Sequence, residues 1–168
     1  NVVLIGTGSI NKLFLKYIKS FECNVVTFNT SSKEKDLIKH LKKAELVISA
    51  LPGTDKTKNF FDKFKLSLLN KKCIFVNIGR GNSVDEKFLI RVLKNNNIRA
   101  AVLDVTKDEP IKKDSALWSL KNVVLTQHTG GGYDSENRDK IEFFLNNLNK
   151  FKINKKKLIN KVNLSKGY

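Results

Sequence analysis

Short apolar runs alternate with amphipathic segments along most of this 168-residue chain, and this alternation limits the possible folds more than any other feature. The runs are rich in Val and Ile and nearly continuously apolar, as is typical of strands that are covered on both faces. The segments between them space their apolar residues as one face of a helix does. Strands and helices that alternate in this way form a parallel sheet with right-handed crossovers, so the sequence predicts an α/β fold.

The positions of the elements follow from these patterns. Strands are expected at 1–5, 24–28, 45–50, 73–78, 99–105 and 122–126. Helices are expected at 9–21, 33–43, 62–69, 85–96 and 135–149, with one irregular helical turn at 115–120. Ser31 or Ser32 is the expected cap of the second helix, because a hydroxyl there can accept from the first backbone amides.

The first strand runs directly into a glycine loop and a helix, in the order Ile5-Gly6-Thr7-Gly8-Ser9. Gly6 permits a tight turn, and Gly8 has no side chain to keep the backbone away from a phosphate. The free amides at the start of the helix then face the anion. Two glycines alone are a weak pattern, but here they open a strand–loop–helix–strand unit, which supports a dinucleotide site. The fold is therefore predicted to be a Rossmann-type, doubly wound parallel sheet in three αβα layers.

The glycine loop departs from the usual fingerprint at two positions. Asn11 replaces a third glycine that normally allows close packing, so the helix is expected to lie slightly further from the sheet. Asn29 ends the second strand where a carboxylate would bind the adenosine ribose. Hydroxyls at Thr30, Ser31 and Ser32 and the cation of Lys33 follow, and they could bind a 2′-phosphate. These residues favour NADP over NAD, with a plain ribose bonded to Asn29 as the alternative.

Three further stretches carry an Arg, a Glu and a His just beyond successive predicted strands. Arg80, Glu109 and His128 are expected to meet, because ligands of an open α/β sheet bind outside the carboxyl ends of its strands. Reduction of a 2-oxo acid needs these groups: a cation for the carboxylate, an imidazole that gives the oxygen a proton, and a carboxylate that orients the imidazole. Each residue alone would be an ordinary surface or strand-end side chain; together they favour catalysis.

At these stretches the chain resembles the nucleotide-binding domain of the D-isomer-specific 2-hydroxyacid dehydrogenases, the family of D-lactate, phosphoglycerate and glyoxylate/hydroxypyruvate enzymes. The resemblance runs in order from residue 2 to about residue 149. It rests on Gly6-Thr7-Gly8-Ser9-Ile10, Leu51-Pro52-Gly53-Thr54, residues 77–85, residues 103–110, Leu117-Trp118 and residues 122–128. Gln127 replaces the proline that is usual before the histidine, and Thr106 stands where an aromatic residue is common.

The resemblance implies roles for individual residues. Arg80 would bind the substrate carboxylate and carbonyl, His128 would be the acid/base, and Glu109 would be its partner. Asp104 would lie near the nicotinamide carboxamide. The residues expected to bind the dinucleotide are Gly6, Gly8, Ser9, Ile10, Asn29, Thr30, Ser31, Leu51, Pro52, Ile78, Gly79, Asp104, His128 and Gly131. Trp118 is expected to pack rather than to touch the cofactor.

The net charge of +16 raises the alternative of a nucleic-acid partner. Only four of the 32 basic residues are Arg, the side chain that reads bases and phosphates in a bidentate manner, so no nucleic-acid or membrane partner is expected. Cys23 and Cys73 are too few and too far apart for a metal site, and none is expected. Each begins an apolar strand and is expected to be a buried, reduced thiol, which favours a cytoplasmic location.

The ends of the chain suggest its domain organisation. Asn1 already lies in a buried-strand pattern, so an N-terminal substrate-domain portion is expected to be absent from this chain. Residues 1–149 are expected to form the dinucleotide-binding domain, and residues 150–168 an arm that packs on a substrate domain. By resemblance, the protein is expected to be a homodimer.

Two functions remain open from the sequence. The first is an oxidoreductase that transfers a hydride between NAD(P)H and a 2-oxo or D-2-hydroxy acid. The second is a dinucleotide-binding regulatory module without turnover, like the transcriptional corepressors related to this family. The intact set of Arg, Glu and His favours the enzyme.

Overall fold

The computed structural model describes residues 1–29, 31–153 and 158–165. The chain divides into two compact units, Asn1–His128 and Thr129–Tyr168.

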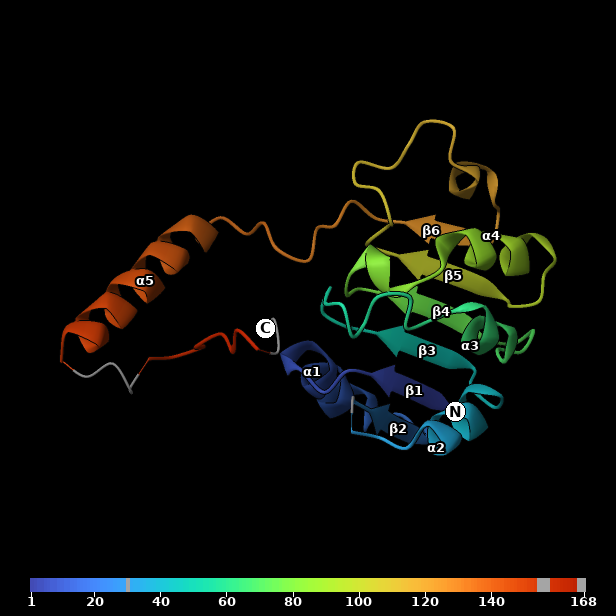
Figure 1. The fold of residues 1–168 in the computed structure, drawn as a ribbon, viewed down its shortest axis with the longest axis horizontal. Helices are drawn as coiled ribbons and strands as arrows, with labels where there is room; N and C mark the ends of the chain where they lie inside the picture. The colour runs from blue at the N-terminus through green and yellow to red at the C-terminus, as the bar shows by residue number, and fades with distance from the viewer. Residues whose placement is uncertain (30, 154–157, 166–168) are drawn as a thin grey trace. The chain divides into compact units, whose positions relative to one another are not determined.

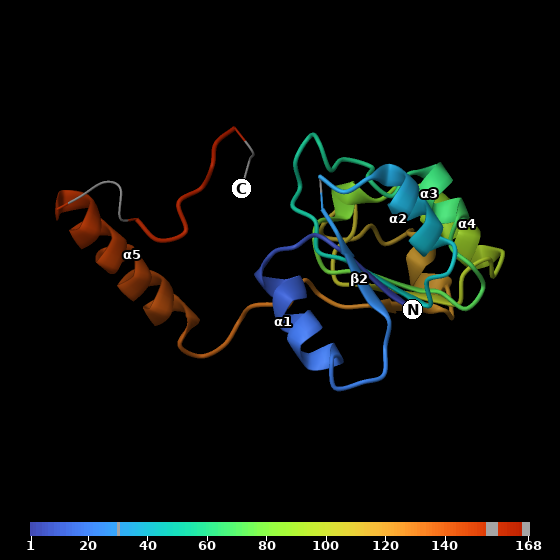
Figure 2. The ribbon, with the colours of Figure 1, turned by 90° about the horizontal axis from the view of Figure 1, so that it is seen from below.

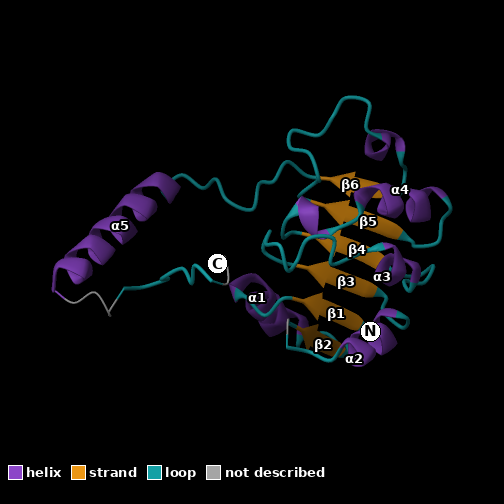
Figure 3. Ribbon diagram, in the orientation of Figure 1, coloured by secondary structure: helices purple, strands orange, loops and turns teal. Residues whose placement is uncertain are grey.

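The first unit is built on a single six-stranded parallel sheet with the order β2-β1-β3-β4-β5-β6 (Figures 1 and 3). The strands are β1 (Val2–Ile5), β2 (Val25–Phe28), β3 (Leu46–Ser49), β4 (Ile74–Asn77), β5 (Ala100–Leu103) and β6 (Val123–Leu125). All six predicted strands are therefore present, each slightly shorter than expected, and the predicted Rossmann-type α/β fold is confirmed.

The helices agree with the predicted positions except at their ends. They are α1 (Ser9–Ile18), α2 (Glu34–Leu41), α3 (Lys63–Ser67), α4 (Glu86–Lys94) and the 3-10 turns η1 (Gly81–Ser83) and η2 (Ala116–Ser119). The Asp62 carboxylate caps α3 by accepting from the Lys65 amide, and that of Asp85 caps α4 through Phe88. The expected serine cap of α2 is wrong: the helix follows Lys33 without a side-chain cap, because Ser32 bonds to Asn29 instead.

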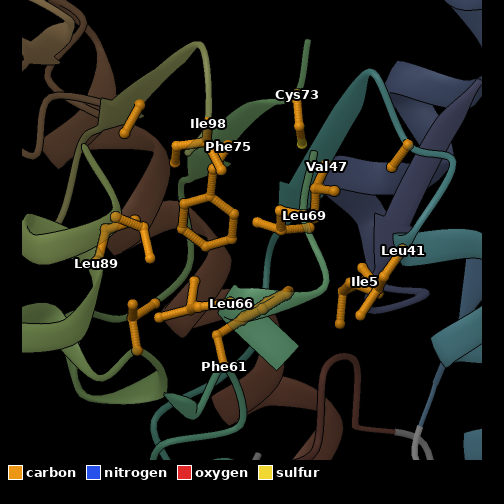
Figure 4. Close-up of a cluster of buried hydrophobic side chains, with 14 of the residues drawn as sticks. Ile5, Leu41, Val47, Phe61, Leu66, Leu69, Cys73, Phe75, Leu89 and Ile98 are labelled. Atoms are coloured by element: carbon orange, nitrogen blue, oxygen red, sulfur yellow. The ribbon is translucent and has the colours of Figure 1, made fainter. Parts of the chain in front are cut away.

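The helices cover the two faces of the sheet unequally, as Figure 2 shows: α2, α3 and α4 lie on one face and α1 on the other. The larger hydrophobic core lies under the three helices (Figure 4). Phe61 and Phe75 are completely buried in it and pack edge to face with ring centroids 4.8 Å apart. A smaller cluster of Val2, Leu4 and Ile48 lies under α1. The predicted three-layer arrangement is thus present.

The two cysteines have different environments. Cys73 is fully buried as expected, and burial raises the pKa of its thiol to about 12. Cys23 is exposed, so its predicted burial is wrong. Its amide bonds to the Phe21 carbonyl in the connection after α1, which keeps it outside strand β2.

The second unit consists mainly of α5 (Glu136–Ile153), which runs past the domain boundary expected at residue 149. No residue of this helix is buried within the unit. The Asn147 side chain binds the backbone of Ile159 in both directions, at 3.1 and 3.0 Å, and so ties the following segment to the helix. No helix in the described ranges is both long and apolar enough to cross a membrane.

Candidate functional site

The register of the sheet brings the carboxyl ends of all six strands into one row. Their last residues pair across the sheet in the order Phe28, Ile5, Ser49, Asn77, Leu103 and Leu125. The loops that follow these residues carry the glycine loop, Asn29, Leu51-Pro52, Ile78-Gly79, Asp104 and Thr126. Strand β1 lies between β2 and β3 in the sheet. The chain passes from β1 to β2 on one side and then crosses to β3 on the other side, so the strand order reverses at β1. Such a switch point is where α/β sheets bind ligands.

The glycine loop has the geometry that its two glycines predict. Gly6 has a φ of +97°, a left-handed conformation that favours glycine, and its amide donates to the Phe28 carbonyl at 2.8 Å. A Cβ atom at Gly6 would lie 3.0 Å from the Ala50 carbonyl oxygen. At Gly8 a Cβ would meet no atom of the described residues within 4 Å, so the backbone is open to an approaching group. Helix α1 starts directly after Gly8 without a side-chain cap.

Asn11, at the position of the third glycine of the fingerprint, is bonded to the glycine loop. Its side chain is only 2% exposed, and its amide nitrogen donates to the carbonyl oxygens of Ile5 at 3.0 Å and Gly6 at 2.8 Å. Asn11 is therefore a hydrogen-bond donor to the loop itself, and the wider spacing between helix and sheet stays a prediction. The sequence pattern treats this position only as a packing site, which is why the bonds were not predicted.

The end of β2 forms a local turn around Asn29. The Asn29 side-chain oxygen accepts from the Ser31 amide at 2.9 Å and from the Ser32 hydroxyl at 3.3 Å. The Ser32 hydroxyl in turn accepts from the Asn29 amide at 2.9 Å. Thr30, also expected to bind the dinucleotide, lies outside the described residues. Ser31 and Lys33 are exposed in the segment after β2, the strand that pairs with β1 and so lies next to the strand that leads into the glycine loop.

A braced turn after β4 presents Arg80. The buried Asn77 accepts from the Gly79 amide and donates to the Arg80 carbonyl, each at 3.2 Å. The Ser83 hydroxyl also donates to the Arg80 carbonyl, at 2.7 Å. A Cβ atom at Gly81 would overlap the Thr106 carbonyl, so this glycine lets the β4 and β5 loops touch. The Arg80 side chain is exposed, with one guanidinium N–H donating to the Gly79 carbonyl at 2.8 Å.

His128 and Glu109, which are 19 positions apart in the sequence, contact each other in the structure, as expected. The His128 Nδ1 atom lies 2.8 Å from Glu109 Oε2. The other carboxylate oxygen accepts from the Thr106 amide at 3.0 Å. The hydrogen bond from His128, assisted by the Thr106 amide and by the charges of His128 and Arg80, holds the pKa of Glu109 below its usual value of 4.5. Arg80 therefore acts electrostatically on the same pair.

The backbone of His128 adopts a left-handed conformation, with a φ of +56°. Residues other than glycine rarely adopt this conformation, and such outliers occur where surrounding structure over-determines them, often at functional sites. The preceding Thr126 donates its hydroxyl to Asp104 at 2.5 Å, which ties the end of β6 to the end of β5. Gly131, the remaining expected cofactor residue, belongs to the second unit.

A cavity of about 370 Å³ adjoins the His128–Glu109 pair. Its apolar wall includes Ile111, Trp118 and Leu125. Trp118 is 57% exposed, so its predicted packing role is wrong: its indole N–H donates to the Lys112 carbonyl at 2.9 Å, which leaves much of the ring accessible. Mostly apolar cavities with a few convergent polar groups are typical of small-molecule sites.

Three residues of the site were missed by the sequence reasoning: Asn77, Thr106 and Thr126. Each supports another group through a hydrogen bond. Asn77 was the only one with a visible signal, as an amide inside an otherwise apolar strand. The role of Thr106 depends on its backbone amide, which no side-chain pattern reveals.

Known proteins are similar to this chain in both sequence and architecture. A family model described as the NAD binding domain of D-isomer specific 2-hydroxyacid dehydrogenase matches residues 1–130. The probable 2-ketogluconate reductase of Dictyostelium discoideum is 34% identical over 158 residues, covering 88% of this chain and 47% of that protein. The chain thus spans about half the length of this curated relative.

Two solved structures extend the likeness. A D-isomer specific 2-hydroxyacid dehydrogenase from Xanthobacter autotrophicus Py2, crystallised with NADPH, superposes with a TM-score of 0.87 at 25% identity, covering 99% of this chain and 72% of that one. An NADPH-dependent glyoxylate/hydroxypyruvate reductase from Sinorhizobium meliloti, crystallised with NADP and malonate, gives 0.79 at 27% identity, covering 90% and 49%. Because the family model matches residues 1–130, which are most of this chain, the chain belongs to the D-isomer specific 2-hydroxyacid dehydrogenase family, through its NAD binding domain.

Proposed function

We propose that the whole protein is an oxidoreductase that transfers a hydride between NAD(P)H and a 2-oxo or D-2-hydroxy acid. The observation that carries this proposal is the 2.8 Å pair of His128 and Glu109 at the ligand-binding edge of the sheet, within the electrostatic reach of Arg80. Curated relatives of this family include enzymes named for glyoxylate, hydroxypyruvate and 2-ketogluconate reduction. These names favour an enzyme over a regulatory module without turnover.

The proposed mechanism divides the work among three side chains. The Nδ1 atom of His128 faces Glu109, so the opposite ring nitrogen, Nε2, is the one available to a substrate oxygen. In reduction His128 gives its proton to that oxygen, and in oxidation it takes the proton back. Glu109 stabilises the imidazolium, and Arg80 binds the substrate carboxylate through its planar guanidinium. A bound nicotinamide dinucleotide supplies or accepts the hydride.

The glycine loop fits the proposed cofactor. Within the described residues, the backbone N–H groups of Thr7, Gly8 and Ser9 have no protein acceptor, and Gly8 is open to an approaching group. Such N–H groups at a helix start favour an anion, here a pyrophosphate. We propose that the remaining predicted residues complete the site. They are Gly6, Ile10, Asn29, Thr30, Ser31, Leu51, Pro52, Ile78, Gly79, Asp104, His128 and Gly131.

We further propose that the cofactor is NADP. The first support is the absence of a carboxylate at Asn29 and the exposed Ser31 and Lys33 that follow it. The second is that several family structures similar to this chain were solved with NADP or NADPH.

Exchanging Asn29 for Asp tests the cofactor preference. The variant keeps the oxygen that accepts from Ser31, so the turn is retained while a negative charge is added. We expect NADPH binding to weaken by about tenfold or more relative to NADH, because two like charges at close range repel. The dissociation constants of both cofactors, measured by calorimetry, give the ratio. Asn24→Asp adds the same charge at the opposite end of β2 and should leave the ratio unchanged; an unchanged ratio in Asn29→Asp would contradict the NADP assignment.

The pH dependence of Glu109 follows from its lowered pKa. A carboxyl group whose pKa is lower in the folded state than in the unfolded chain stabilises the folded state at any pH above its unfolded pKa. This contribution is lost as the pH falls through the folded pKa. We therefore expect the Glu109 carboxyl carbon to titrate below pH 4.5 in an NMR experiment. In His128→Asn the midpoint should rise, since the main cause of the shift is the hydrogen bond from His128. An unmoved midpoint would mean that the pair does not form in solution.

A turnover assay decides between the enzyme and the regulatory module. The whole protein is incubated with NADPH and a panel of 2-oxo acids that includes glyoxylate, hydroxypyruvate and pyruvate, and NADPH oxidation is followed by absorbance. The proposed enzyme oxidises NADPH with at least one of them. A protein that binds NADPH tightly but turns over none of the panel would favour the regulatory function.

We also propose that residues 1–149 form the dinucleotide-binding domain, that residues 150–168 pack on a substrate domain, and that the whole protein is a cytoplasmic homodimer without nucleic-acid or membrane partners. These proposals rest on the family resemblance and the Lys-rich composition. Sedimentation velocity of the whole protein tests the dimer, and a binding assay with duplex DNA at several salt concentrations tests the absence of a nucleic-acid partner.

A further inference from the structure

Asn11 occupies a position in the glycine loop region that the dinucleotide fingerprint reserves for glycine, and it is one of few polar side chains in the interior of the first unit. Its side-chain amide nitrogen donates to the Ile5 carbonyl at 3.0 Å and to the Gly6 carbonyl at 2.8 Å. The Ile5 carbonyl also accepts from the Ala50 amide, so the bond to Gly6 is the one that adds a constraint absent from the sheet.

The orientation of the Asn11 amide is unambiguous. A flipped amide would point its oxygen at two carbonyl oxygens, which cannot donate. In the observed orientation, the oxygen is buried and has no hydrogen-bond partner among the described residues. Burying an acceptor unpaired is unfavourable, so the side chain is held here by its two donor bonds rather than by satisfaction of the whole amide.

The bond to Gly6 has a consequence for the next residue. A trans peptide unit is planar, with its C=O and N–H groups pointing in opposite directions. The carbonyl of Gly6 points to the buried amide of Asn11. The N–H of Thr7, on the same peptide plane, therefore points away from the interior, toward the mouth of the loop. It is one of the N–H groups that lack a protein acceptor within the described part of the chain.

We propose that Asn11 is a positioning residue of the dinucleotide site: by holding the Gly6 carbonyl toward its own buried amide, it directs the Thr7 N–H at the cofactor pyrophosphate. This role rests on the dinucleotide-binding function proposed above. The absence of the third glycine then does not weaken the dinucleotide site. In the fingerprint, a glycine at this position allows close packing of the helix; in this chain, the Asn11 side chain holds the loop by a direct hydrogen bond instead.

Two variants of the whole protein test the role. Asn11→Gly restores the fingerprint but removes both donors, and Asn11→Asp keeps the shape but leaves only acceptor oxygens. Each is expected to weaken NADPH binding by about tenfold, the effect of losing one or two hydrogen bonds. Binding of adenosine, which has no pyrophosphate, should stay close to that of wild type in an NMR titration. Leu13→Gly is the control, because it places a glycine in the same helix at an exposed, uncharged position.

A measurement on the chain without ligand separates this role from the cofactor assignment. In Asn11→Gly the Thr7 amide resonance should shift, because the peptide plane that it shares with the Gly6 carbonyl is no longer held, whereas Leu13→Gly should leave this resonance in place. If Asn11→Gly binds NADPH as tightly as wild type, or loses NADPH and adenosine equally, the positioning role is overturned. An unchanged Thr7 amide overturns it as well. If wild type binds no dinucleotide while the Thr7 amide responds as expected, the proposed function fails and only the local hydrogen bond is upheld.

Discussion

Replacing His128 by Asn in the whole protein is expected to lower kcat for 2-oxo acid reduction by about 10²–10⁴-fold, the usual contribution of a general acid or base. Asn can occupy the same position but cannot deliver a proton at neutral pH. The half-exposed imidazole contacts Glu109 through Nδ1 and leaves Nε2 for substrate, so the loss should fall on the chemical step. Steady-state and single-turnover rates of NADPH oxidation measure it.

The control for this variant is the other histidine of the chain. His40 lies in α2, where its ring contacts Phe28 at a centroid distance of 5.7 Å, on the side of the sheet that carries the larger core. His40→Asn should therefore leave kcat near that of wild type. The dissociation constant for NADPH should change far less than kcat in His128→Asn. A His128→Asn enzyme as fast as wild type would remove the proposed acid/base.

Replacing Arg80 by Ala is expected to lower kcat/KM for 2-oxo acids by about 10²–10³-fold, similar to the loss of one preorganised donor at a site of developing charge. The turn that presents Arg80 is held through its backbone carbonyl, which accepts from Asn77 and Ser83, so truncating the side chain leaves the turn in place. Arg80→Lys should recover only part of the loss, because Lys keeps the charge but cannot form the bidentate contact.

The matched control for Arg80 lies at the other end of the sheet. Arg99 is exposed and precedes β5 at its amino end, far along the strand from the ligand-binding edge. Arg99→Ala removes the same charge from the chain, so a general electrostatic effect would appear in both variants. Equal losses in Arg80→Ala and Arg99→Ala would contradict a specific contact between Arg80 and the substrate carboxylate.

The strands could be predicted well because each is a short, nearly continuous apolar run, and burial on both faces leaves little choice of residue type. The ends of helices were harder. The serines before α2 have the right type for a cap, but the Ser32 hydroxyl bonds to Asn29, a competition between neighbours that residue preferences do not resolve. The exposure of Cys23 and Trp118 depends on how a connection and a loop lie against the sheet, which periodicity does not describe.

The candidate site shows the same division. The expectation that Glu109 and His128 meet follows from where their segments end in the sheet, and the structure confirms the contact itself. The Thr106 amide on Glu109 was not predictable, because a backbone donor carries no residue-type signal. For Asn11, the sequence identified an unusual residue but assigned it a steric effect, whereas the structure gives it two hydrogen bonds.

By itself, the sequence determined the parallel α/β fold, the glycine loop at the first strand end and the set of three chemically competent residues near later strand ends. The fold follows from the local pattern of apolar and polar residues. The glycine loop and the three reactive residues follow from residue types at particular positions along the chain. Only the tertiary structure decided which groups touch: the His128–Glu109 pair, the braced turn at Arg80 and the bond from Asn11 to Gly6. Hydrogen bonds require distances of about 3 Å and defined angles, and those are set by the register of strands far apart in the chain.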